Sequence, residues 1–462
     1  MMKKRAIISV FVKEGVLELA SFLNDSGWEI LSTGGTAAYL TQNNIPVTDV
    51  SSVTRFPECL DGRVKTLHPA IHAGILARRD NPAHMAKIKE LSVQPIDLVC
   101  VNLYPFFEKV QANLPFNDTV EFIDIGGPTM LRAAAKNYQD VLVITDPSDY
   151  AQVIKGLKNN TISLSFRRQL AGKVFNLTAT YDAAISRFML GETGENEYPE
   201  HYVLSLKKQQ ALRYGENGHQ SAALYVAADH KGAFGGMKQL QGKELSYNNI
   251  RDLDVAWKGV CAYSQFIKNA VPVSGKDTEG NTVTANFASA AGSVFTIALK
   301  HNTPCGAALG KNVLESYKKT YNCDSVSIFG GIIGCSAVID EDAALEMKNC
   351  FLEVIVAPGF TDGALKVLAE KKNLRLVVAE IPANETHDFL SVDGGFLVQS
   401  RDNKLFEKWD VVTKAKPAQS QINEMAFGMT IAMFAKSNAI LVIKDQTAIG
   451  IGCGQTNRIW AA

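Results

Sequence analysis

The sequence lacks an excess of charge of either sign, and it lacks any long apolar run. Lysine and arginine together number 47, as do aspartate and glutamate, so the formal net charge is zero and the pI is about 7.1. This balance gives the chain no overall attraction to nucleic acid or to an anionic membrane surface. A stretch of about 18 consecutive apolar residues, the pattern of a membrane-spanning helix, does not occur. We therefore expect neither a nucleic-acid partner nor a membrane partner.

Paired or metal-binding cysteines are also missing. The eight cysteines are scattered, with no CxxC pair and no histidine at metal-ligand spacing. The PCG at 304–306 lacks the HxE and PCxxC pattern of zinc deaminases, so we expect no metal. The basic start of the chain leads into an apolar run that Lys13 and Glu14 interrupt, which predicts a strand rather than a signal peptide. Reduced thiols and a cytoplasmic location are the expectation.

Apolar strands alternate with helical segments in the first half of the chain. Strand-like runs are followed by periodic segments such as residues 15–22, and this alternation is typical of a parallel sheet with helices on both faces. The sequence therefore predicts an α/β fold. The expected strands span residues 6–12, 28–31, 96–101 and 141–144.

A length of 462 residues predicts two or three domains. A long helical stretch over residues 163–190 leads into the polar segment GETGENEYPE, where we place a boundary near residue 195. The predicted domains are thus 1–195 and 196–462. The polar residues 274–293 predict a surface insertion in the second domain.

The most informative stretch is DGRVKTLHPAIHAGILARR, residues 61–79. Arg63 and Lys65 are two residues apart, so in an extended segment they point the same way, and Thr66 adds a hydroxyl. Pro69 fits the first turn of a helix. A loop that offers two cations, a hydroxyl and a helix N-terminus predicts an anion receptor. The alternative for an isolated Arg-x-Lys pair is a solvated surface loop.

The stretch IDIGGPTMLRAAAKN, residues 123–137, is a second candidate for ligand binding. Asp124 precedes two glycines, which let a ligand oxygen approach backbone N–H groups closely. Pro128 then opens a strongly helical run. A tight turn that only caps the helix is the alternative.

Two further motifs follow predicted strands. STGGTAAYL, residues 32–40, combines a strand end, a glycine turn with hydroxyls and a helix start, which is the general plan of a phosphate cradle. It has neither a GxGxxG fingerprint nor a Walker lysine. In CVNLYPF, residues 100–106, a buried strand ends in Asn102 and Tyr104. Ligands of open parallel sheets bind outside the carboxyl ends of the strands, where all four motifs are expected.

The second half has separate candidates. The strand predicted over 294–299 runs into KHNTPCG, which places Lys300 and His301 at a strand end. A histidine can accept a proton near neutral pH, and a lysine can donate one or stabilise a neighbouring charge. The alternative is a histidine that is simply hydrogen-bonded at a strand end.

Two other polar segments of the second half gather donors. LRYGENGHQ, residues 212–220, holds Arg213 and Tyr214 in a glycine-rich turn, for which a capping loop is the alternative. SYNNIRDLDVAW supplies Asn249 and Asp252.

These motifs resemble one family along nearly the whole chain, from about residue 5 to residue 458. RVKTLHP and IDIGGPTMLRAAAKN are similar to the cyclohydrolase domain of the bifunctional AICAR transformylase/IMP cyclohydrolase family. KHNTPCG, LRYGENGHQ, SIFGG, APGF and FAKSNAILVIKDQTAIGIGCGQTNR are similar to its transformylase half. The resemblance implies a methylglyoxal-synthase-like parallel-sheet domain followed by a duplicated cytidine-deaminase-like region without zinc.

The resemblance also implies the last two steps of de novo IMP synthesis. The first step transfers a formyl group from the co-substrate 10-formyltetrahydrofolate to AICAR, giving FAICAR, and the second closes the ring to IMP with loss of water. The expected ligands are AICAR, FAICAR, IMP and folate. A homodimer that shares its transformylase sites between subunits is the implied assembly.

Candidate site residues follow from the same resemblance. Those implied around the ring-closing centre are Lys65, Tyr104, Asp124, Lys136 and the amide near Gly126. The phosphate and ribose contacts implied in the first domain are Ser9, Lys13, Thr33, Gly35, Thr36, Arg63, Thr66 and Asn102. For formyl transfer, the family implies that His301 with Lys300 moves the proton off the substrate amine and that Asn438 polarises the formyl group. The remaining nucleotide contacts implied are Arg213, Tyr214, Asn249, Phe329 and Gly330, with Arg458 and Ile459 near the folate.

Two departures from the family pattern stand out. The usual SVSDK near the start is SVFVK, with Phe11 and Val12 in place of a serine and an aspartate, which removes one expected hydroxyl contact to the nucleotide. The chain stops at NRIWAA, before the DAFFPF, QPGGS and RHF motifs of the family, so we expect a C-terminally truncated transformylase region.

Two alternatives to the full bifunctional enzyme stay open on the sequence. In one, only the cyclohydrolase works, and the second half is an inactive scaffold. In the other, the chain is a phosphate- or nucleotide-sensing module without catalysis, similar to methylglyoxal-synthase-like regulatory domains. A phosphate site that is indifferent to loss of Lys65, Tyr104 and Lys136 would favour the sensing module.

Overall fold

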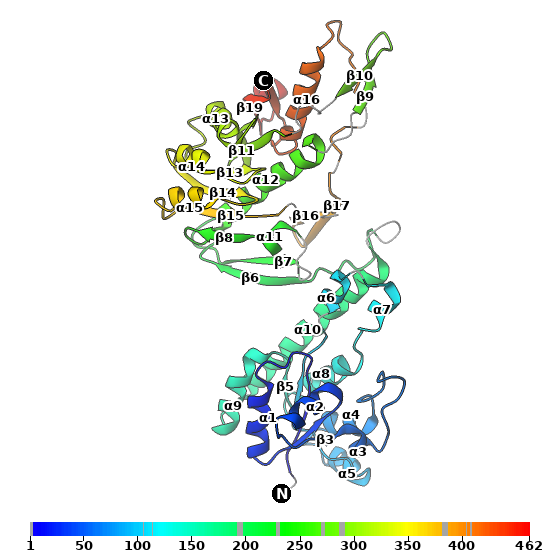
Figure 1. Ribbon diagram of the computed structural model, residues 1–462. Coiled ribbons are helices and arrows are strands. Elements are labelled where there is room, and N and C mark those ends of the chain that lie inside the picture. Colours follow the sequence, from blue (N-terminus) through cyan, green and yellow to red (C-terminus); the bar gives the residue numbers. More distant parts are fainter. Residues whose placement is uncertain are drawn as a thin grey trace. The chain divides into compact units, whose positions relative to one another are not determined.

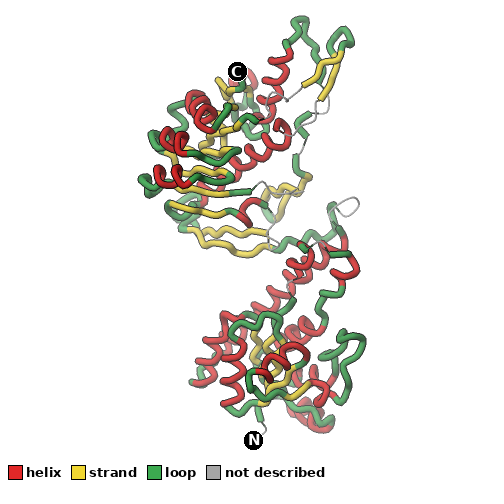
Figure 2. The backbone as a smooth tube through the Cα atoms, in the orientation of Figure 1, coloured by secondary structure: helices red, strands yellow, loops and turns green. Residues whose placement is uncertain are grey.

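The structure is a computed structural model that describes residues 3–104, 106–112, 114–191, 197–227, 232–268, 273–285, 292–380, 387–402, 404–406 and 409–462. The chain folds into two compact units, Met1–Ser205 and Leu206–Ala462. Figure 1 and Figure 2 show the elements of each unit.

The first unit is built on a five-stranded parallel sheet with the strand order β3-β2-β1-β4-β5. The order reverses between β1 and β4, and such a switch point is where open parallel sheets bind ligands. All strands except the short edge strand β3 are nearly fully buried, as expected for a sheet covered on both faces. They are β1 (Arg5–Ser9), β2 (Glu29–Ser32), β3 (Thr48–Asp49), β4 (Leu98–Val101) and β5 (Leu142–Ile144).

Helices surround this sheet and complete one hydrophobic core. Ser163 begins the longest helix by accepting a hydrogen bond from the Phe166 N–H, and Gly191, with a φ of 74°, ends it. The predicted long helix is thereby confirmed. The helices are α1 (Val16–Asp25), α2 (Gly34–Gln42), α3 (Val50–Thr54), α4 (Pro69–Leu76), α5 (Pro82–Glu90), α6 (Phe106–Gln111), α7 (Phe116–Val120), α8 (Gly126–Lys136), α9 (Tyr150–Lys158) and α10 (Leu164–Leu190), with a 3₁₀ turn at Pro147–Asp149.

Two local predictions and one assumption about the backbone need correction. The first strand ends at Ser9 rather than at residue 12, because the chain turns away to meet the loop after β4. Helix α8 already begins at Gly126, so Pro128 is its third residue and does not open it. Residues 61–66 form turns rather than an extended segment, and Leu60, Asp61 and Gly62 all have positive φ.

The second unit contains an eight-stranded mixed sheet with the order β18-β19-β12-β11-β13-β14-β15-β8. Strands β13, β14 and β15 pair in parallel, and the other pairs are antiparallel. These strands are β8 (Lys238–Gln241), β11 (Val294–Lys300), β12 (Thr303–Gly310), β13 (Gly331–Cys335), β14 (Leu352–Ala357), β15 (Arg375–Val378), β18 (Ile440–Lys444) and β19 (Thr447–Gly452).

Successive residues of the central strands face opposite sides of this sheet, so the unit has two cores. Ile297 and Leu299 pack in a cluster with α12 (Tyr247–Tyr263) and α16 (Gln419–Ala432), whereas Ala298 packs in a cluster with the helices of the other face. Those helices are α13 (Val313–Cys323), α14 (Glu341–Met347) and α15 (Asp362–Leu368).

Shorter elements complete the second unit. Residues 274–293, predicted as a surface insertion, contribute to an antiparallel hairpin in the part that the structure describes. These elements are the pairs β6 (Leu206–Leu212) with β7 (Ala222–Ala227), β9 (Val273–Lys276) with β10 (Thr282–Ala285) and β16 (His387–Val392) with β17 (Gly395–Ser400), helices α11 (Ala233–Gly236) and α17 (Arg458–Ala461), and a π-helical turn at Ser264–Lys268. None of the helices within the described ranges is long and apolar enough to cross a bilayer.

Candidate functional site

The loops after β1 and β4 are joined at the switch point of the first sheet. Ser9 lies opposite Val101 in the parallel register, so both strands end at the same edge. The Asn102 side chain then binds the β1 loop: its Oδ1 accepts the N–H groups of Phe11 (2.5 Å) and Val12 (3.1 Å), and its Nδ2 donates to the Val12 carbonyl (3.1 Å). Asn102, predicted as a nucleotide contact, thus holds together the two loops that follow β1 and β4; we call the opening between these loops the mouth of the site.

Phe11 and Tyr104 form an aromatic pair at this mouth. Their ring centroids are 4.9 Å apart, and the two residues are 43% and 44% exposed. The position where the family pattern has a serine therefore supplies an aromatic contact to a predicted catalytic residue.

Lys13 and Thr36 hold the β1 loop from the inside. The Thr36 hydroxyl accepts from the Val10 N–H (3.1 Å) and from Lys13 Nζ (3.1 Å), and it donates to the Val10 carbonyl (3.0 Å). Lys13 Nζ also donates to the Val10 carbonyl, and partial burial lowers the pKa of this lysine. Because the Thr36 hydroxyl is buried and fully bonded, it fixes the loop.

Lys65 reaches the N-terminus of α2. Its Nζ pairs with Glu58 Oε1 at 2.9 Å and lies 3.6 Å from where a Cβ on Gly34 would stand. Thr33 caps this helix in an extended conformation without using its side chain, so its hydroxyl does not serve the cap. A Cβ on Gly35 would meet nothing within 4 Å, so this helix start is open to a ligand.

Thr66 and Arg63 connect the same loop to the region before α8. The Thr66 hydroxyl lies 2.7 Å from where a Cβ on Gly126 would stand, which brings the two predicted anion-binding motifs together. Arg63 is exposed and pairs with Glu121, which raises the pKa of its guanidinium. Its charge is therefore shared with a carboxylate that the sequence patterns did not indicate.

Asp124 is a half-buried carboxylate just before α8. It accepts the Gly127 N–H at 3.0 Å, and burial raises its pKa although the backbone N–H groups of Gly127 and Gly126 favour the charged form. The backbone N–H of Asp124 donates to the Tyr181 hydroxyl at 2.7 Å. No sequence pattern singled out Tyr181, which lies in the middle of α10.

Lys136 is the one predicted ring-closing residue placed apart from the others. It is exposed and ends α8, whereas Asp124 and Gly126 lie at the beginning of that helix. Ten helical steps of 1.5 Å separate Gly126 from Lys136 by about 15 Å along the axis.

In the second unit, His301 and Asn302 form a two-residue turn between β11 and β12. Their φ values are 54° and 59°, both left-handed, which matches the twist of a tight hairpin. The carboxylate of Asp252, on α12, accepts the Asn302 N–H at 2.6 Å. Burial raises the pKa of Asp252, and hydrogen bonds from the backbones of Asn302 and His301 act against that rise.

Lys300 and His301 line a cavity of about 420 Å³ together with residues of β12, β19 and the segment after α13. Lys300 Nζ donates to the Phe329 carbonyl at 2.7 Å, and Gly330 follows with a φ of 73°. The structure thus brings together the predicted proton-transfer pair and two predicted nucleotide contacts. Among the described residues, no group of three His, Cys, Asp or Glu side chains is arranged to hold a metal ion.

Asn249 and Arg213 belong to a second polar cluster of this unit. Asn249 is buried in the first turn of α12 and donates to Glu353 Oε2 at 2.6 Å. The Arg375 guanidinium lies 3.6 Å from the same carboxylate. Burial lowers the pKa of Arg375, and the positive charge of Arg213 lowers it as well. The Arg213 guanidinium stands 5.7 Å from the Tyr214 ring centroid.

Asn438 lies beside the segment that borders the His301 cavity. Its backbone N–H and its Nδ2 both donate to the Gln455 carbonyl, at 3.0 and 2.9 Å. Gln455 follows two residues after Cys453, which lines the cavity. Arg458 and Ile459 begin α17 and are exposed, with Ile459 at 81%.

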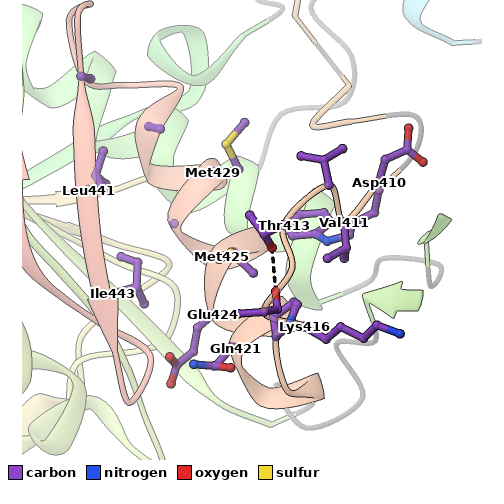
Figure 3. Close-up of a pocket in the computed structure, with 17 residues that line it drawn as sticks. Asp410, Val411, Thr413, Lys416, Gln421, Glu424, Met425, Met429, Leu441 and Ile443 are labelled. Carbon is purple, nitrogen blue, oxygen red and sulfur yellow. Dashed lines mark hydrogen bonds between the residues drawn. The ribbon is translucent and has the colours of Figure 1, made fainter. Parts of the chain in front are cut away.

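A larger cavity of about 860 Å³ involves none of the predicted site residues (Figure 3). Met425 and Met429 of α16 and Leu441 and Ile443 of β18 contribute apolar side chains to it. Lys416, also in its lining, pairs with Glu279 at 2.6 Å and with Asp277 at 3.0 Å.

Comparison with known proteins decides the family. Residues 134–462 match the family described as "AICARFT/IMPCHase bienzyme", and residues 15–129 match the "MGS-like domain" family. The chain belongs to the AICARFT/IMPCHase bienzyme family. Relatives named "Bifunctional purine biosynthesis protein PurH" include one from Clostridium acetobutylicum, 53% identical over 462 residues that make up 100% of this chain and 86% of the relative. One from Clostridium perfringens strain SM101 is 53% identical over 461 residues, with the same coverage.

The solved structure "Crystal structure of ForH" is 32% identical, covers 41% of this chain and 100% of its own, and has a TM-score of 0.37. Membership of the bienzyme family means that this AICARFT/IMPCHase protein is an enzyme of purine biosynthesis with two activities, AICAR formyltransferase and IMP cyclohydrolase. They are the final two steps to IMP, and 10-formyltetrahydrofolate is the co-substrate of the first. The predicted family and function are confirmed, and the sensing module without catalysis is excluded.

Proposed function

We propose that ring closure takes place in the first unit, at the mouth between β1 and β4, and formyl transfer in the second unit, around the His301 turn. The catalytic domains proposed are 1–195 and 196–462. The observation that carries the first assignment is the meeting of Lys65, the open N-terminus of α2 and the N-terminus of α8 at one sheet edge.

The nucleotide phosphate is proposed to bind at the start of α2. Gly35 leaves the helix N–H groups accessible, the Thr33 hydroxyl is not used by the cap, and Lys65 supplies a positive charge. Backbone N–H groups at a helix N-terminus attract an anion. The residues proposed to form or fix this nucleotide site are Ser9, Lys13, Thr33, Gly35, Thr36, Arg63, Thr66, Asn102 and Gly126.

Ring closure forms a C–N bond and loses water. The carboxamide nitrogen of FAICAR attacks the formyl carbon, and negative charge develops on the formyl oxygen. The proton released by the attacking nitrogen returns to this oxygen, and the C–O bond then breaks as the hydroxyl leaves as water with a second proton, taken from the formamide nitrogen. We assign Asp124 to accept the proton that leaves the nitrogen, and Lys65, Tyr104 and the amide of Gly126 to stabilise the developing oxyanion. Lys136 lies about 15 Å along α8 from this group, and its part in the reaction stays a prediction.

Formyl transfer moves the formyl carbon from N10 of the folate to the 5-amino group of AICAR. As the amine attacks, it loses a proton, which we assign to His301 with Lys300 beside it, and the folate nitrogen leaves with a proton. Asn438 is proposed to polarise the formyl oxygen. Proposed nucleotide contacts are Arg213, Tyr214, Asn249, Phe329 and Gly330, and proposed folate contacts are Arg458 and Ile459.

Finer features of the family complete the proposal. The second unit is proposed to be a duplicated cytidine-deaminase-like fold that works without zinc. The assembly is proposed to be a cytoplasmic homodimer that shares its transformylase sites.

The first experiment is to mix the purified protein with FAICAR and follow IMP formation by absorbance. Lys65→Ala should lose ring closure, whereas the surface variant Lys87→Ala, whose lysine pairs with Glu90 on α5, should keep it. Equal rates for the Lys65→Ala variant and the unchanged protein would refute the assigned site. Formation of tetrahydrofolate from AICAR and 10-formyltetrahydrofolate, with His301→Ala beside it, tests the second site. Ring closure without formyl transfer would restrict the activity of this chain to the first domain.

A further inference from the structure

Tyr181 lies between the two loops that carry the proposed ring-closing groups. It is in the middle of α10 and only 5% exposed. Its hydroxyl accepts the backbone N–H of Asp124 at 2.7 Å and donates to the carbonyl of Phe122 at 3.2 Å. One buried hydroxyl therefore links the backbone at both ends of the segment 122–124, as acceptor at one end and as donor at the other.

The ring of the same residue supports the second loop. Its centroid is 6.0 Å from that of Phe106, in an edge-to-face arrangement, and Phe106 begins α6 two residues after Tyr104. Phe106 is itself 1% exposed, so this contact belongs to the core. The end of the β4 loop and the start of α8 thus share a single support on α10.

Burial keeps this support in one protonation state. The pKa of Tyr181 is raised to about 12, chiefly by burial. The hydrogen bond from the Asp124 backbone acts against this rise, and the nearby charges of Asp124, Asp182 and Tyr104 contribute to it. At neutral pH the hydroxyl is protonated and can donate to the Phe122 carbonyl at all times.

We propose that Tyr181 is a positioning residue of the cyclohydrolase, which holds Asp124 and Tyr104 at their working separation through its hydroxyl and its ring. This inference rests on the catalytic roles proposed above for Asp124 and Tyr104. Tyr181 touches neither substrate nor reacting atoms. It acts by fixing the backbone from which Asp124 projects, and small displacements of an acid–base group cost much of its effect on rate.

The test is Tyr181→Phe in the full chain, with Tyr150→Phe as the matched control. Both tyrosines belong to the same core, at 5% and 4% exposed, and each substitution removes one buried hydroxyl and keeps the ring. The Tyr150 hydroxyl meets only the Cys100 thiol, at 3.5 Å, among the bonds that the structure records for it. The assay is steady-state ring closure of FAICAR, with thermal unfolding of each variant measured in parallel.

We expect Tyr181→Phe to lower kcat about tenfold with KM for FAICAR within twofold of the unchanged protein, because the variant removes both hydrogen bonds that hold residues 122–124, and one buried hydrogen bond alone can account for up to about tenfold. Tyr150→Phe should keep kcat, because its hydroxyl contacts neither of the two loops. Unchanged kcat in Tyr181→Phe, an equal loss in both variants, or a rise in KM alone would overturn the positioning role. Asp124→Asn distinguishes the proposed base from the proposed positioning residue. If Asp124→Asn keeps the full rate, the catalytic assignment of Asp124 is wrong. If Asp124→Asn is inactive while Tyr181→Phe is fully active, only the positioning role of Tyr181 is wrong.

Discussion

The ring of Phe11 lies 4.9 Å from the ring of Tyr104, at an interplanar angle of 49°. Aromatic pairs of this kind contribute about 0.5–1.5 kcal/mol beyond their buried area. Both side chains are about half exposed, so little else restrains Tyr104 from that side. The pair therefore restrains the Tyr104 ring from the side of the β1 loop.

Replacing Phe11 by serine should weaken this restraint. We expect kcat for ring closure to fall by roughly two- to tenfold, as the energy of an aromatic pair implies. Phe11→Tyr keeps the ring and should keep the rate. Steady-state assays of the two variants decide the matter, and a serine variant as fast as the tyrosine variant would speak against the pair.

Loss of the Asp252 carboxylate should disturb the turn that carries His301. Asp252→Ala leaves the Asn302 N–H without its acceptor, and we expect kcat for formyl transfer to fall by about tenfold or more, since hydrogen bonds to charged groups contribute about 1.5–3 kcal/mol. Asp252→Asn keeps an acceptor and should recover part of the rate. Asp254→Asn, on the same helix, removes only a pair with Lys258 and is the control. Formation of tetrahydrofolate is the measurement, and equal rates for Asp252→Ala and Asp254→Asn would contradict the expectation.

Ring closure should lose activity in acid at a higher pH than an exposed aspartate would cause. Burial raises the pKa of Asp124, and the proposed base is the ionised carboxylate, so activity is present above this raised pKa and falls as the pH drops through it. For stability the sign is opposite: a raised carboxyl pKa stabilises the fold at low pH, and this contribution disappears as the pH rises through the folded-state pKa. The pH–rate profile of kcat tests the first statement, and an acid limb in the range of an exposed aspartate would contradict it.

Gly35→Ala and Gly172→Ala form a matched pair for the phosphate site. A Cβ at either position meets nothing within 4 Å, so neither substitution strains the fold. Gly172 lies inside α10, where alanine should stabilise by about 0.5–1 kcal/mol without changing the kinetics. At Gly35 the methyl group would occupy the approach to the N-terminus of α2, and we expect KM for FAICAR to rise about tenfold. Equal KM values in the two variants would place the phosphate elsewhere.

Much of the first unit follows from sequence patterns, because strand–helix alternation and glycine turns are local. Four of the five strands and helix α10 lie within a few residues of their predicted bounds, and α4 begins at Pro69 as predicted, whereas the short strand β3 was not predicted. The expectation that Arg63 and Lys65 point the same way assumed an extended backbone, and a short run of polar residues does not show that the chain turns through left-handed conformations at residues 60–62. The pairing of Arg63 with Glu121 depends on side chains 58 residues apart, which no spacing reveals.

The supports of the site were less accessible than its polar residues. The sequence pattern singled out Asp252, but it could not show that its carboxylate accepts the Asn302 N–H, because the two residues are 50 positions apart. Tyr181 lies in an ordinary amphipathic helix and resembles any core tyrosine. The Thr36 hydroxyl was predicted to touch the nucleotide, and only the fold shows that the Val10 backbone and Lys13 occupy it. Tertiary contacts of this kind are set by packing, which a local pattern does not encode.

Helix α12 has a consequence for the geometry of the second unit. Asn249 and Asp252 are three residues apart in its first turns, so about 4.5 Å of helical rise separates the proposed nucleotide contact Asn249 from Asp252, which accepts a hydrogen bond from the His301–Asn302 turn. Further along, Trp257 and Val260 of the same helix are buried against the sheet. The distance between the proposed nucleotide contact Asn249 and the residue that supports the turn of the proposed proton acceptor, His301, is therefore set by one helix that is anchored in the core, and no loop intervenes between them.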